Sequence, residues 1–158
     1  MTRRHLLTTC RTAFLLLIML PGAVAFADAS IWSADKAARA LQNNEIILLD
    51  IRSPQEWQET GLAEGAWPVS LHEPGFGEKI GAIIRANENR TIALICAVGG
   101  RSASVLSHLK GLGVSNFVDV SEGMLGSKAG PGWIKRDLAI VPLKKAQETL
   151  DSAMPALQ

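Results

Sequence analysis

The sequence predicts a single α/β domain in which a mainly parallel sheet is covered by helices on both faces. Short apolar runs without polar alternation, over residues 45–51 and 91–96, are typical of strands buried on both sides. Stretches with helical spacing lie between the strands, and this alternation favours parallel pairing. The chain has 158 residues, which is enough for one such core and not for two.

Each expected element has a local reason. Ser33 can cap a helix over 34–42. A second helix starts at Ser53, because a serine cap followed by Pro54 and by Glu56 three positions later makes a capping box. The other expected elements are a weak strand over 66–71, a helix between Gly75 and Asn87, a strand over 91–96, a helix with the inner stripe Val105, Leu106, Leu109 and Leu112 that Gly113 stops, and a strand over 117–120.

The first 27 residues have the pattern of an export signal. Three arginines precede an uncharged, mostly apolar run over 13–27, which ends in small residues with A-x-A spacing. This run is shorter than the roughly 20 apolar residues of a membrane span, and it contains Pro21. We therefore expect a signal peptide over 1–27, cleaved after Ala27, with a retained anchor as the alternative. The general and the twin-arginine export routes both stay open. The expected location is the periplasm, without stable membrane association after cleavage.

Charge and cysteine content exclude several classes of protein. The formal net charge is +1, which gives no general attraction to nucleic acid. Cleavage after Ala27 removes three arginines from 16 basic side chains and leaves 13 against 15 acidic ones, a net charge of −2. Two cysteines are too few for a disulfide framework or a cysteine-rich zinc module. Cys10 leaves with the signal, so Cys96 becomes a lone thiol where thiols usually pair. It is either buried and inert or kept because it reacts.

The segment after the strand over 91–96 carries the strongest chemical signal. Ligands of parallel α/β sheets bind at the carboxyl ends of strands, and Cys96 lies at such an end, before a helix. Paired glycines let the backbone curl so that its N–H groups converge, and such a nest at a helix start favours a thiolate. We expect that thiolate to be charged and exposed. A buried cysteine that ends a strand, with glycines for a turn, is the alternative. The expected loop is Cys96, Ala97, Val98, Gly99, Gly100, Arg101 and Ser102, in which Arg101 adds positive charge at the rim and Ser102 caps the helix or donates to a bound oxyanion.

This loop resembles the active-site loop of the rhodanese (sulfurtransferase) family, whose single-domain members read Cys-x-x-Gly-x-Arg-Ser. The resemblance covers about residues 31–142, and 143–158 then form a tail that can hold a short helix. It implies a rhodanese-like fold with a central five-stranded sheet. Four further landmarks match the family in order, namely 48–57, Gly65-Ala66, Leu112-Gly113 and 120–123.

The resemblance also implies a reaction. The Cys96 thiolate would attack the outer sulfur of a sulfane donor such as thiosulfate, leaving sulfite and a Cys96 persulfide. A thiophilic acceptor, which can be cyanide, a small thiol or the cysteine of an acceptor protein, would then remove that sulfur. The family chemistry needs no metal and no organic cofactor. Ala97 and Val98 are apolar where thiosulfate users often have a cation, so thiosulfate is open to question as the donor.

Four residues outside the loop are secondary candidates. Asp50 and Arg52 end a strand at the same edge as Cys96, and they either position the loop and tune its field or form an ion pair that holds the turn. Met124 and Trp133 follow the last strand, where a glycine-rich segment is expected near the mouth of the site. They are possible rim residues that set the choice of acceptor, and a core position is the alternative for Trp133. His72 and His108 are not expected at the site.

Three other functions stay open. A phosphatase or arsenate reductase would also use a cysteine cradled by backbone N–H groups, but the phosphatase signature has five residues between cysteine and arginine. Four residues intervene here, which suits a single sulfur better than a tetrahedral oxyanion. A non-catalytic sulfur carrier and a protein-binding module are the other two alternatives.

Overall fold

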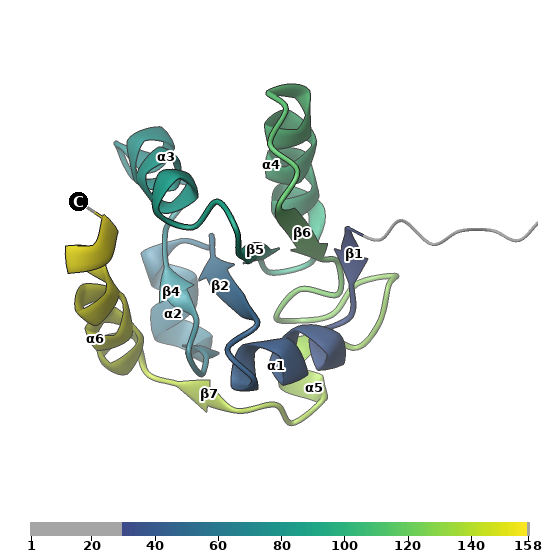
Figure 1. Cartoon of the computed structure of the whole chain (residues 1–158). Helices are drawn as coiled ribbons and strands as arrows, with labels where there is room; N and C mark the ends of the chain where they lie inside the picture. The colour runs from purple at the N-terminus through teal and green to yellow at the C-terminus, as the bar shows by residue number, and fades with distance from the viewer. Residues whose placement is uncertain (1–29, 158) are drawn as a thin grey trace, which may run out of the picture.

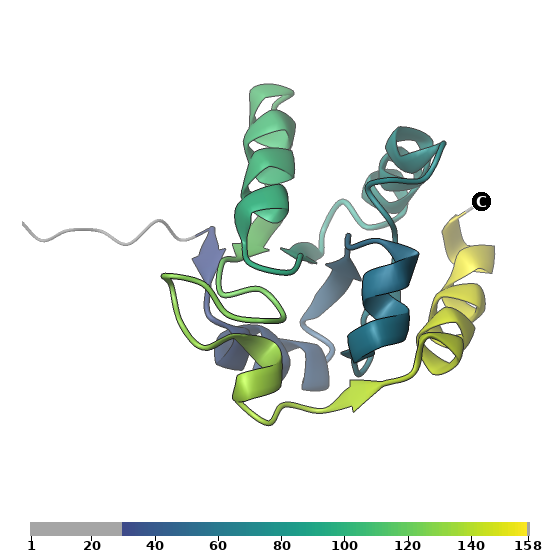
Figure 2. The ribbon, with the colours of Figure 1, turned by 180° about the vertical axis from the view of Figure 1, so that it is seen from behind.

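The computed structural model of the chain describes residues 30–157, and the expected signal peptide lies outside the described residues. Figures 1 and 2 show a central sheet with helices packed on both faces. The strands are β1 (Ile31–Trp32), β2 (Ile46–Asp50), β3 (Leu62–Ala63), β4 (Trp67–Pro68), β5 (Thr91–Ile95), β6 (Phe117–Val120) and β7 (Ile140–Val141). The helices are α1 (Ala34–Gln42), α2 (Pro54–Thr60), α3 (Phe76–Ala86), α4 (Gly100–Gly111), α5 (Gly132–Lys135), α6 (Leu143–Ala153) and the short 3-10 helix η1 (Met154–Leu157).

The predicted sheet is confirmed. Five strands pair in the order β1-β6-β5-β2-β4, and each of these pairings is parallel. Two neighbouring strands inside the sheet, β2 and β5, are the longest, and every residue of β2 is buried. Their register pairs Ile46 with Thr91 and Asp50 with Ile95. The strands β2 and β5 therefore end together, and the loops after them begin at the same edge of the sheet.

Two hydrophobic layers flank the sheet. On one face, Ile80 and Ile83 of α3 and Leu106 and Leu109 of α4 pack on the strands. On the other face, the alanines of α1 pack with residues that follow β6. Figure 1 shows α3 and α4 on one side of the sheet and α1 and α5 on the other. Because strand side chains alternate between the faces, each strand feeds both layers.

The sequence signals at the starts of α1 and α2 are confirmed, and the buried stripe of α4 is shorter than expected. Ser33 accepts a hydrogen bond from the Lys36 amide at 3.2 Å, and Ser53 and Glu56 form the complete capping box of α2. In α4, Leu106 and Leu109 are buried as predicted, but Leu112 is 67% exposed. Leu112 follows the end of α4, where the helix has passed beyond the sheet.

The residues after 142 pack on the domain. Ala146 and Leu150 of α6 join Trp57 of α2 in a third apolar cluster, and α6 lies beside β4. The strands β3 and β7 form a small antiparallel pair at this end of the molecule. Within residues 30–157 no helix has both the length and the apolar character that crossing a membrane requires.

Candidate active site

Cys96 follows β5 directly and faces the layer of α3 and α4. It belongs to the same apolar cluster as Ile92 and Leu94, which precede it at spacings of four and two residues. The residue is 0% exposed. The expectation of an exposed sulfur is therefore wrong for this state of the molecule. The reason is that Cys96 continues the strand by one residue and remains inside the packed layer.

The sulfur nevertheless has polar neighbours. The Ser102 hydroxyl donates toward Cys96 Sγ at 3.4 Å and toward the Gly99 carbonyl oxygen at 3.1 Å. The pKa of Arg101 is raised, chiefly by its hydrogen bond to Glu56, and Cys96 makes a smaller contribution. The sulfur thus has a hydroxyl beside it and is not surrounded by aliphatic side chains alone.

The loop after Cys96 is fastened to the segment that follows β6. The Met124 amide donates to the Cys96 carbonyl oxygen at 2.8 Å, and the Leu125 amide donates to the Ala97 carbonyl oxygen at 2.9 Å. Gly99 has a φ of +82°, and a Cβ there would lie 2.2 Å from the Ser121 carbonyl oxygen. Only glycine fits this backbone conformation and this contact. The two loops therefore form one rigid unit around the cysteine.

The N-terminus of α4 lies at this loop, as the sequence predicts. Ala103 donates its amide to the Gly99 carbonyl oxygen at 3.1 Å. The amides of Gly100, Arg101 and Ser102 precede it in the first turn, where a helix supplies no acceptor of its own. The helix dipole adds partial positive charge at this end.

Arg101 lies at the rim, as predicted, but its charge has a partner that the sequence analysis missed. Its guanidinium binds both carboxylate oxygens of Glu56, at 2.6 and 2.8 Å. The hydrogen bond from Arg101 is the main cause that lowers the pKa of Glu56 to about 2. His72 Nε2 lies 3.2 Å from the same guanidinium. His72 is therefore next to the site, contrary to expectation.

Asp50 and Arg52 form a buried ion pair that holds the start and end of α2. The Arg52 guanidinium donates to both Asp50 carboxylate oxygens, at 2.7 to 3.0 Å. Its remaining donors reach the Thr60 hydroxyl and the Gly61 carbonyl oxygen, each at 2.7 Å. These partners lie at the C-terminal end of α2. The contacts favour the structural alternative, an ion pair that supports the turn after β2.

The prediction that Met124 forms a rim is wrong, and for Trp133 the structure shows the alternative, a core position. Met124 is 0% exposed and Trp133 is 2% exposed, and both pack in the layer that faces α1. The Trp133 indole N–H donates to the Ala139 carbonyl oxygen at 3.0 Å. Met124 contributes its backbone amide to the cysteine loop and its side chain to the core. Leu125 and Val98 are the exposed apolar residues at these loops.

Asp119 is a buried acid that the sequence analysis treated only as part of a strand. It is 3% exposed, lies on β6 beside α4, and its Oδ1 atom has no hydrogen-bond partner. Burial raises the pKa of Asp119, and hydrogen bonding by Ser102 partly offsets the effect. Ser102 therefore has one hydroxyl proton and three acceptors around it, namely Cys96, the Gly99 carbonyl oxygen and Asp119. The sequence signal that could have pointed to this buried acid was an aspartate among the apolar residues of a strand.

Glu122 fixes the long loop after β6. Its carboxylate accepts from Arg136 at 2.7 and 2.8 Å and from the Gly132 amide at 3.1 Å. The hydrogen bonds from Arg136 are the main cause that lowers the pKa of Glu122. Through this pair, the segment that covers the cysteine loop is fastened to α5. Across residues 30–157, no group of three His, Cys, Asp or Glu side chains is arranged to hold a metal ion.

Comparison with known proteins identifies related chains. The rhodanese-like domain family matches residues 33–129. An uncharacterized protein of Rickettsia prowazekii is 26% identical over 102 residues, which cover 61% of this chain and 83% of the relative. The crystal structure of a rhodanese-related protein from Thermoplasma volcanium has 25% identity and a TM-score of 0.54, over 70% of this chain and 95% of that one. A protein of unknown function from Rhodopseudomonas palustris, described as a possible tyrosine phosphatase, has 18% identity and a TM-score of 0.46, over 69% and 82%.

Proposed function

Because the chain belongs to the rhodanese-like domain family, we propose that it is a sulfurtransferase that carries sulfane sulfur on Cys96. The observation that carries this proposal is the surroundings of the sulfur. Cys96 lies at the start of α4, with the Ser102 hydroxyl at 3.4 Å and with Arg101 as a charged neighbour. A helix start, a hydroxyl and a guanidinium all stabilise negative charge on sulfur.

The proposed reaction has two balanced steps. The Cys96 thiolate attacks the outer sulfur of a donor such as thiosulfate; a new sulfur–sulfur bond forms, the donor's own bond breaks, and its electron pair leaves with sulfite. The acceptor, which is cyanide, a small thiol or the cysteine of an acceptor protein, then attacks the outer sulfur of the persulfide. The electron pair of that bond returns to Cys96. Ser102 and Arg101 stabilise the anionic sulfur in both steps.

Intact-mass spectrometry of the full chain tests the proposal. After incubation with thiosulfate, we expect a gain of one sulfur atom that cyanide removes with release of thiocyanate. Cys96→Ala should lose the adduct, whereas Cys10→Ala, the matched control, should keep it. Persistence of the adduct in Cys96→Ala, or no adduct with thiosulfate or with an organic persulfide, would overturn the proposal.

The same experiments separate the alternatives. A stable adduct that cyanide does not remove favours a sulfur carrier. No adduct with any sulfane donor favours a protein-binding module. Hydrolysis of p-nitrophenyl phosphate that is lost in Cys96→Ser, without turnover of thiosulfate, favours a phosphatase or arsenate reductase.

We also propose that the protein acts in the periplasm after loss of residues 1–27. The three arginines, the apolar run and the small residues at its end support this location. N-terminal sequencing of the protein from a periplasmic fraction should begin at Asp28. An intact N-terminus in the membrane fraction would instead support a retained anchor.

A further inference from the structure

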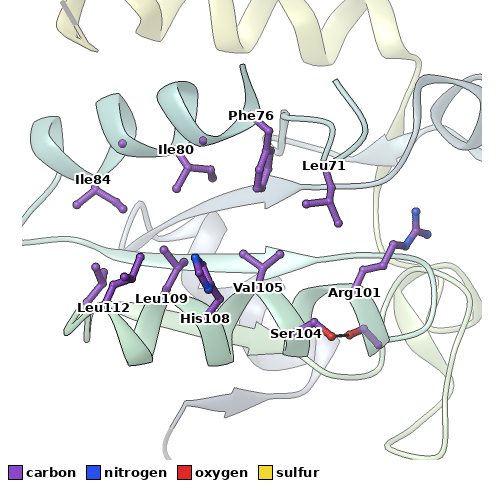
Figure 3. A pocket seen from close by; sticks show the side chains of 14 residues that line it. Leu71, Phe76, Ile80, Ile84, Arg101, Ser104, Val105, His108, Leu109 and Leu112 are labelled. Carbon is purple, nitrogen blue, oxygen red and sulfur yellow. Dashed lines mark hydrogen bonds between the residues drawn. The ribbon is translucent and has the colours of Figure 1, made fainter. Parts of the chain in front are cut away.

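A groove lies between α3 and α4, on the face of the sheet toward which Cys96 points. Its volume is about 720 Å³, within the range of about 300–1,000 Å³ that is typical of small-molecule sites. We define the α3–α4 groove by Phe76, Ile80 and Ile84 on α3 and by Arg101, Val105 and Leu109 on α4. In Figure 3 the α3 side chains point toward those of α4 across the groove.

Both walls of the groove are suited to an apolar occupant. The side chains of Phe76, Ile80 and Ile84 recur every four residues along α3. Beside them, Gly77 and Gly81 leave open space: a Cβ at Gly77 would meet no atom within 4 Å, and one at Gly81 would meet only the end of the Arg85 side chain. The groove is therefore wide where a side chain would otherwise fill it.

The groove has few polar side chains, and its arginine is paired with Glu56, which lies outside the lining. Arg101 and His108 are the ionisable residues among the described residues that line it, and none of the lining residues carries a carboxylate. Ser104 adds one hydroxyl, which already donates to the Gly100 carbonyl oxygen at 3.0 Å (Figure 3). An occupant of the groove therefore meets an almost wholly apolar lining.

The groove is continuous with the cysteine loop, because Gly100 and Arg101 belong both to that loop and to the groove lining. From Arg101 to Leu112 the helix rises about 16 Å, so the groove leads away from the sulfur as an elongated apolar track. An occupant whose head meets Cys96 would lay its tail along this track.

We propose that the α3–α4 groove binds the apolar tail of the sulfur acceptor, which is a thiol with a long alkyl chain. This inference rests on the proposed function and names the substrate class for it. The acceptor thiolate attacks the outer sulfur of the Cys96 persulfide, the persulfide bond breaks, and the products are an alkyl persulfide anion and the Cys96 thiolate. The tail in the groove holds the acceptor at the cysteine loop.

The chain-length dependence of sulfur transfer tests the inference. The full chain is loaded with thiosulfate and assayed with straight-chain thiols from ethanethiol to octanethiol, below their solubility limits. Burial of each added methylene should raise kcat/KM about two- to fourfold. The ratio of octanethiol to ethanethiol should therefore be about fifty or more. Turnover with cyanide, which has no tail, is measured in parallel and reports on the chemistry alone.

Two glycine variants locate the effect. Gly77→Leu fills the groove where there is room for a side chain and should reduce the octanethiol-to-ethanethiol ratio at least tenfold. Gly111→Leu is the matched control, because a Cβ there also meets nothing within 4 Å and Gly111 does not line the groove. It should keep the ratio of the natural chain.

The outcomes distinguish the two proposals. If cyanide is turned over but kcat/KM is the same for all thiols, the groove inference is overturned and the sulfurtransferase proposal is intact. Failure to form any persulfide overturns the sulfurtransferase proposal. Loss of the octanethiol-to-ethanethiol ratio in both glycine variants would overturn the inference. So would evidence that a second copy of the chain fills the groove: turnover would then depend on protein concentration, and Gly77→Leu would dissociate a dimer.

Discussion

Asp119 is a buried acid whose hydrogen bonding is incomplete. Its carboxyl is buried, one oxygen has no partner, and burial raises its pKa. An acid whose pKa is raised in the folded state stabilises the fold below its unfolded pKa, and this contribution is lost as the pH rises through the folded value. Asp119 therefore makes the fold less stable at neutral pH than in strong acid.

Asp119→Asn should remove this pH dependence. The variant's free energy of unfolding minus that of the natural chain should be about 1–3 kcal/mol larger at neutral pH than in strong acid. Urea titrations at both pH values measure the difference. Asp151→Asn, at an exposed position of α6, is the control. An equal difference at the two pH values would contradict the prediction.

Glu56 has the opposite behaviour. Its pKa is lowered to about 2, chiefly by Arg101, so its contribution is present above its ordinary value of 4.5 and is lost as the pH falls toward about 2. The pair is partly exposed, and we expect Glu56→Gln to cost about 1 kcal/mol at neutral pH and little in strong acid. Thermal unfolding across this range measures the change. Glu59→Gln, exposed on the same helix, should have no such pH-dependent cost.

At the scale of elements, the loop between β5 and α4 depends on one of its two glycines. Gly99 has a positive φ, and a Cβ there would collide with Ser121, whereas a Cβ at Gly100 meets nothing within 4 Å. Gly99→Ala should destabilise the fold by about 1–3 kcal/mol or more and slow persulfide formation. Gly100→Ala should do neither. Equal effects in the two variants, in denaturation and in mass-spectrometric rates, would contradict this.

The long elements were predictable because each has a repeated signal. The apolar runs of β2 and β5 and the capping box of α2 determine their structure locally. The strands β1, β3 and β7 have only two residues each, which is too short for any periodic pattern. They form because the neighbouring backbone offers partners, as when the Ser30 carbonyl oxygen accepts the Asp119 amide.

The cysteine loop of the candidate site was predictable from the sequence, and the residues packed around that loop were not. A strand end followed by glycines and Arg101 is a local pattern. The pairing of Arg101 with Glu56 joins positions 45 residues apart, and the burial of Met124 depends on how the loop after β6 turns. Sequence spacing reports neither, because both are results of packing between elements.

At the scale of the whole molecule, α6 belongs to the packed structure although it lies beyond the region that matches the family. Leu150 is buried against the cluster that contains Trp57. Leu150→Ala should cost about 2–5 kcal/mol of unfolding free energy, measured by urea denaturation. Glu148→Ala, exposed on the same helix, should change it by less than about 0.5 kcal/mol. Similar costs for both would mean that α6 contributes little.

The edges of the central sheet have a consequence for the behaviour of the protein in concentrated solution. Both outermost strands of the described chain, β1 and β4, have two residues, and β4 ends at Pro68, which has no amide hydrogen to donate. A long unpaired edge strand can template the addition of further strands, and two-residue edge strands offer almost no unpaired backbone for this. Copies of this protein that stay folded are therefore poorly equipped to join strand to strand.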